Sequence, residues 1–205
     1  METLLEKTRA ISKLIQRAAG KPIDFEEMAK VLSEKITSNC YIIGRRGKIL
    51  AYWFMDNFHC DEMEKIVMHA ERFPETYNQN LMKITTTQAN TTQVENDCIF
   101  NKNKKCGLSN KITTIVPIMG GGERVGTLVL AKFNKEFTPG DLILAEYGAT
   151  VIGMEILRVK AEQAETEARK KAAVQIAVGT LSYSELEAVE HIFAEIGANE
   201  GLLVA

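Results

Sequence analysis

The chain has 205 residues, of which 45% are hydrophobic and 25% charged, and its formal net charge is −2. This composition is typical of a soluble globular protein of one or two domains, and the small net charge excludes nucleic-acid binding by bulk electrostatic attraction. Four cysteines do not make a disulfide scaffold, no apolar run approaches the ~20 residues that span a bilayer, and the N-terminus lacks a signal-peptide core, so we expect a cytoplasmic protein with no membrane partner.

The first part of the chain predicts two helices and a pair of strands. Apolar residues at three- and four-residue spacing favour a helix over residues 3–19. Asp24 is placed to cap a second helix, in a capping box with the glutamate three positions later. Strand-forming residues then fill 40–43 and 49–54, and the two glycines of the segment 44–48 between them indicate a tight turn.

The middle of the chain gives weaker signals. A short helix is predicted at 61–69, and Phe73-Pro74 interrupts the helical pattern because the residue before a proline avoids helical geometry. A short strand is predicted at 82–86. Residues 87–110 are polar and rich in Thr, Asn and Lys, so they predict a long loop, and a loop of this length in a compact domain is usually functional.

The most regular pattern follows this loop. Strand-like runs at 112–118 and 125–130 flank the glycine-rich turn Gly120–Arg124, which predicts a hairpin. A long helix is then expected from the cap Thr138, through a proline at its first position, to about Ala173 or beyond. This order of a strand, a tight turn, a strand and a long helix resembles the end of a small-molecule sensing domain of the GAF type, and the resemblance implies that the helix passes a signal to an output unit.

The end of the chain predicts a separate unit, and two apolar stripes predict self-association. The polar segment Lys160–Lys171 is expected to be solvated between domains, and the capping box Ser182–Glu185 starts a new helix. Apolar stripes on 3–19 and on the first half of the long helix exceed what one small sheet can cover, so we expect a homodimer.

Several segments closely resemble the CodY family, the nutrient-responsive transcriptional regulators of low-GC Gram-positive bacteria. The resemblance covers nearly the whole chain and is weakest over residues 53–108. The segments that carry it are Leu4–Arg9, Arg45–Lys48, Thr113–Ile118, Gly120–Arg124, Asp141–Leu157 and Leu181–Glu187.

The resemblance implies an α+β protein with three parts. Residues 1–157 would form a GAF domain, an antiparallel sheet flanked by helices, that binds the branched-chain amino acids isoleucine, leucine and valine. Residues 158–181 would form a linker helix, and 182–205 the beginning of a winged helix-turn-helix. The family represses transcription by binding operator DNA, and we expect the recognition helix to lie beyond Ala205. Many members also respond to GTP, for which the resemblance assigns no residue here.

The resemblance also implies a ligand pocket. The family builds it from a methionine, a Phe-Pro pair and a later phenylalanine, and the matching positions are Met63, Phe73, Pro74 and Phe100. Ile66 lies one turn after Met63 on the same predicted helix face. Periodicity alone does not separate such a pocket from an ordinary apolar core.

One departure from the family pattern concerns the ligand carboxylate. The family usually has an arginine directly before the pocket methionine, and this chain has Glu62 there. An acid would repel the carboxylate of an amino acid, although it could engage the ammonium group. Arg72, beside Phe73, is the candidate replacement, because a guanidinium can bind a carboxylate with two hydrogen bonds.

Other site types find little support in the sequence. The spacing of Cys98 and Cys106, with His59 and Cys60 elsewhere, lacks the short paired motif of a structural zinc site. The glycines at 120–122 lack the Lys-Ser/Thr pair of a phosphate loop, and no cysteine is paired with a base in sequence. We therefore expect no metal, no cofactor and no enzyme. A ligand-free dimerisation module and a small GAF-like enzyme remain the alternatives.

Overall fold

The computed structural model describes residues 2–17, 22–55, 62–92, 98, 100, 104 and 110–198, without the side chains at 17, 64, 66 and 195–198. The chain divides into two compact units, Met1–Val159 and Lys160–Ala205, and one helix runs through the division. The described elements, in chain order, are α1 (Leu4–Arg17), α2 (Phe25–Ile36), β1 (Asn39–Gly44), β2 (Ile49–Trp53), the π-helix η1 (Met63–Met68), α3 (Glu75–Met82), β3 (Gln88–Thr92), β4 (Lys111–Gly120), β5 (Glu123–Phe133), α4 (Pro139–Gly179) and α5 (Tyr183–Ala198).

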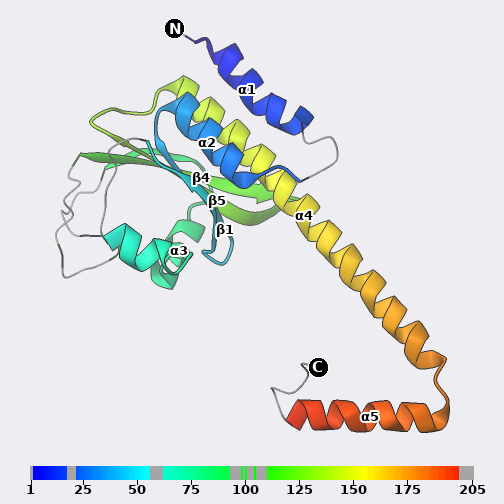
Figure 1. Cartoon of the computed structure of the whole chain (residues 1–205). Helices are drawn as coiled ribbons and strands as arrows, with labels where there is room; N and C mark the ends of the chain where they lie inside the picture. Colours follow the sequence, from blue (N-terminus) through cyan, green and yellow to red (C-terminus); the bar gives the residue numbers. More distant parts are fainter. Residues whose placement is uncertain are drawn as a thin grey trace. The chain divides into compact units, whose positions relative to one another are not determined.

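The first unit is a five-stranded antiparallel sheet with helices on both faces. The strand order is β2-β1-β5-β4-β3, so the two predicted hairpins pair with each other through β1 and β5. Helices α2 and α4 lie side by side over one face, and α3 lies against the other (Figure 1). The α+β fold, an antiparallel sheet flanked by helices, is as the sequence predicts.

The main core lies between the sheet and the helices α1, α2 and α4. Its side chains come from alternate strand positions, since a strand directs successive side chains to opposite faces. The largest fully buried members are Ile11, Met28, Leu32, Ile36, Ile42, Ile118, Leu128, Leu130, Leu144 and Ile152.

Local signals explain most of these elements. The Asp24 carboxylate accepts a hydrogen bond from the Glu26 amide at 2.9 Å and caps α2. The β4–β5 turn places Gly121 and Gly122 at φ of 60° and 81°, a conformation that favours glycine. Helix α4 begins at Pro139 as predicted, and the Asp141 carboxylate accepts from the Thr138 amide at 2.9 Å.

Two predictions in the middle of the chain are wrong. The predicted strand at 82–86 does not form, and a helix, α3, occupies Glu75–Met82 instead. The predicted loop 87–110 begins with a strand, β3, which pairs with β4. The predicted helix at 61–69 exists as a π-helix over Met63–Met68. The helix predicted over 3–19 is α1, and residues 18 and 19 at its predicted end lie outside the described residues.

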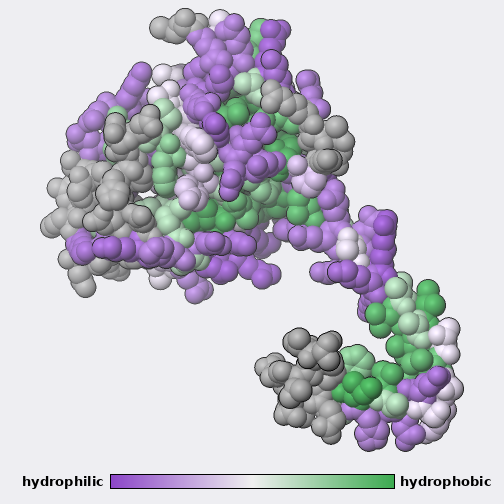
Figure 2. All heavy atoms as spheres, viewed as in Figure 1, coloured by the Kyte–Doolittle hydropathy of each residue, from purple (hydrophilic) through white to green (hydrophobic). Residues whose placement is uncertain are grey.

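The second unit contains the last part of α4 and the whole of α5. Ser182 and Glu185 form the predicted capping box, in which the Glu185 carboxylate accepts hydrogen bonds from the Ser182 hydroxyl and from the Ser182 amide, the latter at 2.8 Å. The hydroxyl bond first, and then the amide bond, lower the pKa of Glu185. Figure 2 shows hydrophobic residues gathered on this unit, among them the exposed Val174, Ile176 and Phe193. None of the described helices combines the length and the apolar composition that crossing a bilayer requires.

Candidate ligand-binding site

The sheet face opposite α2 and α4 carries a second apolar cluster, which we call the aromatic cluster. It lies under η1 and α3, on the side of the sheet where the predicted pocket residues fall. Its buried members are Tyr41, Ile43, Ile49, Met63, Val67, Phe73, Leu81, Ile115 and Val129, and Phe54, Met68, Tyr77, Ile84 and Phe100 are partly buried against them.

Phe73 is the centre of the aromatic contacts. Its ring centroid lies 5.4 Å from that of Tyr77, 5.8 Å from that of Phe100 and 6.1 Å from that of Tyr41. Tyr77 and Phe100 in turn pack edge to face at 5.5 Å. These separations are normal for aromatic rings in contact. A small ligand that enters between Phe73 and Phe100 must therefore separate rings that pack against each other.

The structure brings three of the six predicted site residues together. Met63 and Phe73 are buried in the aromatic cluster, and Phe100 packs against it. Pro74, half-buried, stands at the N-terminal end of α3. The backbone of Ile66 lies in η1, but its side chain is outside the described part of the structure.

The two charged residues that flank the cluster are both engaged elsewhere. Arg72 is exposed, and its guanidinium donates to the Arg46 carbonyl at 3.4 Å, in the turn between β1 and β2. The Glu62 carboxylate forms an ion pair with Lys104, which comes from the segment just after Phe100. Lys104 therefore offsets the negative charge that stands where the family usually has an arginine.

Arg124, the second residue of strand β5, binds the segment at the end of α3 beside the aromatic cluster. Its guanidinium donates to the carbonyls of Leu81 (3.3 Å) and Ile84 at the end of α3, and to the Thr127 hydroxyl at 3.0 Å. Partial burial lowers the pKa of Arg124. The last carbonyls of a helix lack intrahelical partners, so this side chain acts as a C-terminal cap for α3.

Replacing Arg124 with methionine is expected to destabilise the first unit by about 1–3 kcal/mol, because the carbonyls at the end of α3 lose a charged donor while the aliphatic stem is kept. Urea unfolding followed by circular dichroism measures this loss. Arg45→Met is the control, since Arg45 is exposed and its pair with Glu123 spans 3.4 Å. Equal stability of the two variants would contradict the capping role.

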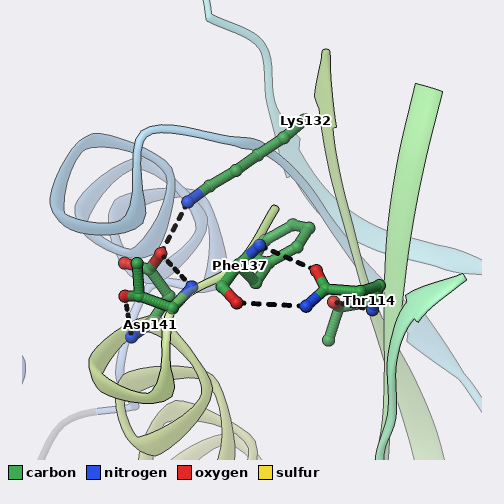
Figure 3. A network of polar contacts seen from close by, with 6 residues as sticks. Thr114, Lys132, Phe137 and Asp141 are labelled. Carbon is green, nitrogen blue, oxygen red and sulfur yellow. Dashed lines mark hydrogen bonds and ion pairs between the residues drawn. The ribbon is translucent and has the colours of Figure 1, made fainter. Parts of the chain in front are cut away.

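A set of polar contacts, which we call the polar joint, connects the sheet to the start of α4 (Figure 3). It consists of Asn90, Thr114, Lys132, Phe137 and Asp141. The Lys132 ammonium lies 2.6 Å from the Asp141 carboxylate, and both side chains are buried. The side chain of Asn90 on β3 forms two hydrogen bonds with Phe137: its Nδ2 donates to the carbonyl at 3.1 Å, and its Oδ1 accepts from the amide at 2.7 Å. The Thr114 hydroxyl accepts from the Asn90 amide at 3.3 Å.

This polar joint connects α4 to the segment that follows α3. Thr87, just before β3, also donates to the Glu146 carboxylate on α4 at 2.7 Å. Arg124 binds Ile84 at one end of the segment, and Asn90 binds Phe137 at the other. Hydrogen bonds therefore tie the segment 84–90 to β5 at one end and to the start of α4 at the other. Sequence analysis missed this joint, because its residues are far apart in the chain.

Two kinds of catalytic group can be examined in the described residues, a thiolate nucleophile and a metal centre. Burial raises the pKa of the Cys40 thiol, so this cysteine does not provide a thiolate nucleophile. No group of three or more metal-ligating side chains occurs among the described residues, whereas His59, Cys60 and Cys106 lie outside them.

Comparison with known proteins identifies relatives over the whole chain. A family model of the CodY GAF-like domain matches residues 3–180. The global transcriptional regulator CodY of Clostridium botulinum strain Hall is 53% identical over all 205 residues, which cover 79% of that protein. CodY of Clostridium tetani is 51% identical over the same length and the same share.

Solved structures agree with this family. The cofactor-binding GAF domain of the nutrient sensor CodY from Clostridium difficile is 32% identical and aligns over 76% of this chain and 99% of that domain, with a TM-score of 0.52. A GAF domain from a phosphoenolpyruvate-protein phosphotransferase of Coxiella burnetii covers 80% of this chain and 99% of its own, also with a TM-score of 0.52, but at 12% identity it supports the fold alone.

These matches confirm the predicted GAF fold and the predicted family. The full-length relatives are named as transcriptional regulators, so the protein is a regulator and not an enzyme, as expected. The structure has a GAF-like sheet with an aromatic cluster on one face, and a long helix that starts at the buried polar joint. The chain belongs to the CodY family.

Proposed function

We propose that this chain is the effector-sensing part of a global transcriptional regulator that binds isoleucine, leucine or valine in the aromatic cluster. The observation that carries the proposal is the meeting of Met63, Phe73 and Phe100 in one apolar cluster on the sheet face opposite α4. An aliphatic amino acid needs such an apolar slot for its side chain and a few polar groups for its charged ends. Ile66, Arg72 and Pro74 complete the proposed site.

The signal is proposed to travel as a population shift. In one state the rings of Phe73 and Phe100 pack against each other, and the ligand stabilises a second state in which these rings separate. A ligand shifts such an equilibrium only through its different affinities for the two states. The hydrogen bonds from Arg124 to Ile84 and from Asn90 to Phe137 would carry the change to α4.

The remaining parts of the regulator follow the predicted division at 157 and 181. Residues 158–181 would act as the linker helix, and α5 as the first helix of a winged helix-turn-helix, whose later recognition helix binds operator DNA. GTP is proposed as a second effector without assigned residues. A cytoplasmic homodimer would use the exposed Leu5, Ile143 and Met154 on α1 and α4 as its contact.

Met63→Ala tests the site. Isoleucine binding should weaken by tenfold or more, while the free energy of unfolding falls by about 2 kcal/mol, because a methionine is lost from an apolar cluster whose flexible neighbours partly fill the gap. Calorimetry with isoleucine and urea unfolding give the two quantities.

Met28→Ala is the matched control, since Met28 is equally buried in the core on the other sheet face. It should cost similar stability and leave isoleucine affinity within twofold. Equal losses of isoleucine affinity in the two variants would mean that Met63 is an ordinary core residue and not part of the binding site.

The packed rings of Phe73 and Phe100 favour one second candidate, a dimerisation module without a ligand. Calorimetry and thermal unfolding with isoleucine, leucine and valine at millimolar concentration separate the two functions. If none of the three amino acids gives a heat of binding or a thermal shift, the dimerisation module is the function and the sensor is ruled out.

A further inference from the structure

The strand register places polar and small residues in one row across the face that carries the aromatic cluster. Asn39 on β1 is opposite Ala131 on β5, which is opposite Thr113 on β4, which is opposite Thr91 on β3. Directly opposite residues of an antiparallel pair point to the same face. We call these four residues the polar row.

The polar row adjoins an apolar row. Tyr41, Val129 and Ile115 are opposite one another in the same register, and all three belong to the aromatic cluster. The two rows are separated by two strand positions, or about 6.6 Å. This face of the sheet is therefore apolar at one level and polar at the next.

Asn39 carries an unpaired donor in this row. Its side chain is 2% exposed, its Oδ1 accepts from the Met55 amide at 2.8 Å, and its Nδ2 has no hydrogen-bond partner. Because the Met55 amide can only donate, it must face Oδ1, and this fixes Nδ2 on the other side of the side-chain amide. A buried N–H group without a partner is destabilising, and such a group in a native structure calls for a physical reason.

We propose that Asn39 Nδ2 binds the carboxylate of the aliphatic amino acid whose side chain rests on the apolar row. Ala131, whose side chain is a single methyl group, lies between Asn39 and Thr113, which are two strand spacings or about 9.6 Å apart. The inference rests on the proposed function and adds a buried donor to the proposed site, in which Glu62 is paired with Lys104 and the exposed Arg72 donates to the Arg46 carbonyl.

A ligand-analogue cycle tests the contact. Isoleucine and 2-methylbutylamine, which is isoleucine without its carboxylate, are titrated into the wild-type chain and into Asn39→Ala by calorimetry. A hydrogen bond to a charged group is worth roughly tenfold or more in affinity. The variant should therefore bind isoleucine at least tenfold more weakly and 2-methylbutylamine within twofold of the wild type. Equal weakening of both ligands, or no weakening, overturns the proposal.

Ser38→Ala is the matched control. Ser38 is also 2% exposed with an unpartnered Oγ, but it precedes β1 and lies outside the polar row. Its replacement should leave isoleucine affinity unchanged. A wild-type chain that binds no branched-chain amino acid would overturn the proposed function itself, whereas a wild-type chain and an Asn39→Ala variant that bind isoleucine equally would overturn only the role of Asn39.

A measurement on the unmodified protein covers the case in which Asn39→Ala does not fold. The side-chain ¹⁵N–¹H₂ resonances of Asn39 should move downfield with isoleucine and with 3-methylpentanoate, which keeps the carboxylate and lacks the ammonium. They should stay in place with 2-methylbutylamine. If the chemical shifts of the Asn39 side-chain amide do not change at saturation with the two carboxylate-containing ligands, the proposal is overturned.

Discussion

Gly153→Ala is expected to destabilise the first unit by about 4 kcal/mol or more, which is exceptional for the addition of one methyl group. A Cβ at position 153 would lie 2.0 Å from the Met119 carbonyl oxygen and 3.0 Å from its carbonyl carbon. Both are backbone atoms of β4, so no side-chain rotation relieves the clash. Gly120 faces this contact from the hairpin, where a Cβ would lie 2.8 Å from the Gly153 carbonyl oxygen.

Relief of the clash requires α4 and the β4–β5 hairpin to move apart. The residues beside the contact, Ile152 on α4 and Ile118 on β4, are fully buried in the main core, so separation opens gaps in close-packed surroundings. Urea unfolding followed by circular dichroism measures the loss, with the midpoint as the primary quantity.

Gly140→Ala in the same helix is the control. The nearest atoms to a Cβ at position 140 are Leu4 Cδ1 and Thr138 Oγ1, both at 3.8 Å, which is ordinary contact. This change should leave stability within about 1 kcal/mol of the wild type, because alanine is the better helix former. A Gly153→Ala variant as stable as Gly140→Ala would mean that α4 does not approach the hairpin so closely.

Elements with a strong local pattern could be predicted from the sequence. The β4–β5 hairpin has strand-forming runs on both sides of a glycine turn, and α4 has a capping threonine followed by a proline. Each signal acts over a few neighbouring residues, so the rest of the fold is not needed to recognise it. The capping box at Ser182 belongs to the same class.

Helix α3 and strand β3 lack such signals. Helix α3 has the sequence ETYNQNLM, in which two asparagines disfavour a helix, and its carbonyls are capped by Arg124 from a distant strand. Strand β3 reads QANTT and has no apolar alternation, since it is an edge strand whose hydrogen bonds come from β4. In both cases tertiary partners supply the stability, so a local pattern could not reveal the element.

The candidate site divides in the same way. Met63, Phe73 and Phe100 were predicted through a family resemblance, and the structure brings them into one cluster. Asn39 could not be identified from the sequence, because the absence of a partner for its Nδ2 is evident only in the three-dimensional structure. The pairing of Asp141 with Lys132 could not be predicted either, because it depends on how α4 meets the sheet.

Lys132→Met is expected to cost about 3–5 kcal/mol at neutral pH, because it leaves the Asp141 carboxylate buried without its cation. The pair is short, at 2.6 Å, and both side chains are at least nine-tenths buried. Lys132 also lies 4.6 Å from the ring centroid of Phe137, so the ammonium contacts the joint from two sides. Urea unfolding at pH 7 gives the loss, and the exposed pair of Arg169 with Glu165 provides the control, since Arg169→Met should cost less than about 1 kcal/mol.

The pH dependence of this loss identifies its cause. Burial alone would raise the pKa of Asp141, but the hydrogen bond and charge of Lys132, together with hydrogen bonds from Thr138, lower it below the ordinary value of 3.8. A carboxyl whose folded-state pKa is depressed contributes stability that is present above its unfolded pKa and is lost as the pH falls through the folded value. The stability difference between wild type and Lys132→Met should therefore be full at pH 7 and shrink below about pH 4. A difference that does not change with pH would assign the loss to packing of the lysine stem and not to its charge.

The double variant Lys132→Met/Asp141→Leu tests whether the unpaired carboxylate causes the loss of stability in Lys132→Met. Replacing both charges with apolar side chains removes the stranded carboxylate, so part of the stability lost in Lys132→Met should return. The return should be incomplete, because the Thr138 amide donates to Asp141 and would lose its acceptor. Asn90 would still hold Phe137 through its two hydrogen bonds, so the link from β3 to the start of α4 would remain. If the double variant is less stable than Lys132→Met, the ion pair is not what makes the single change costly, and the cap that Asp141 provides to α4 is the larger contribution.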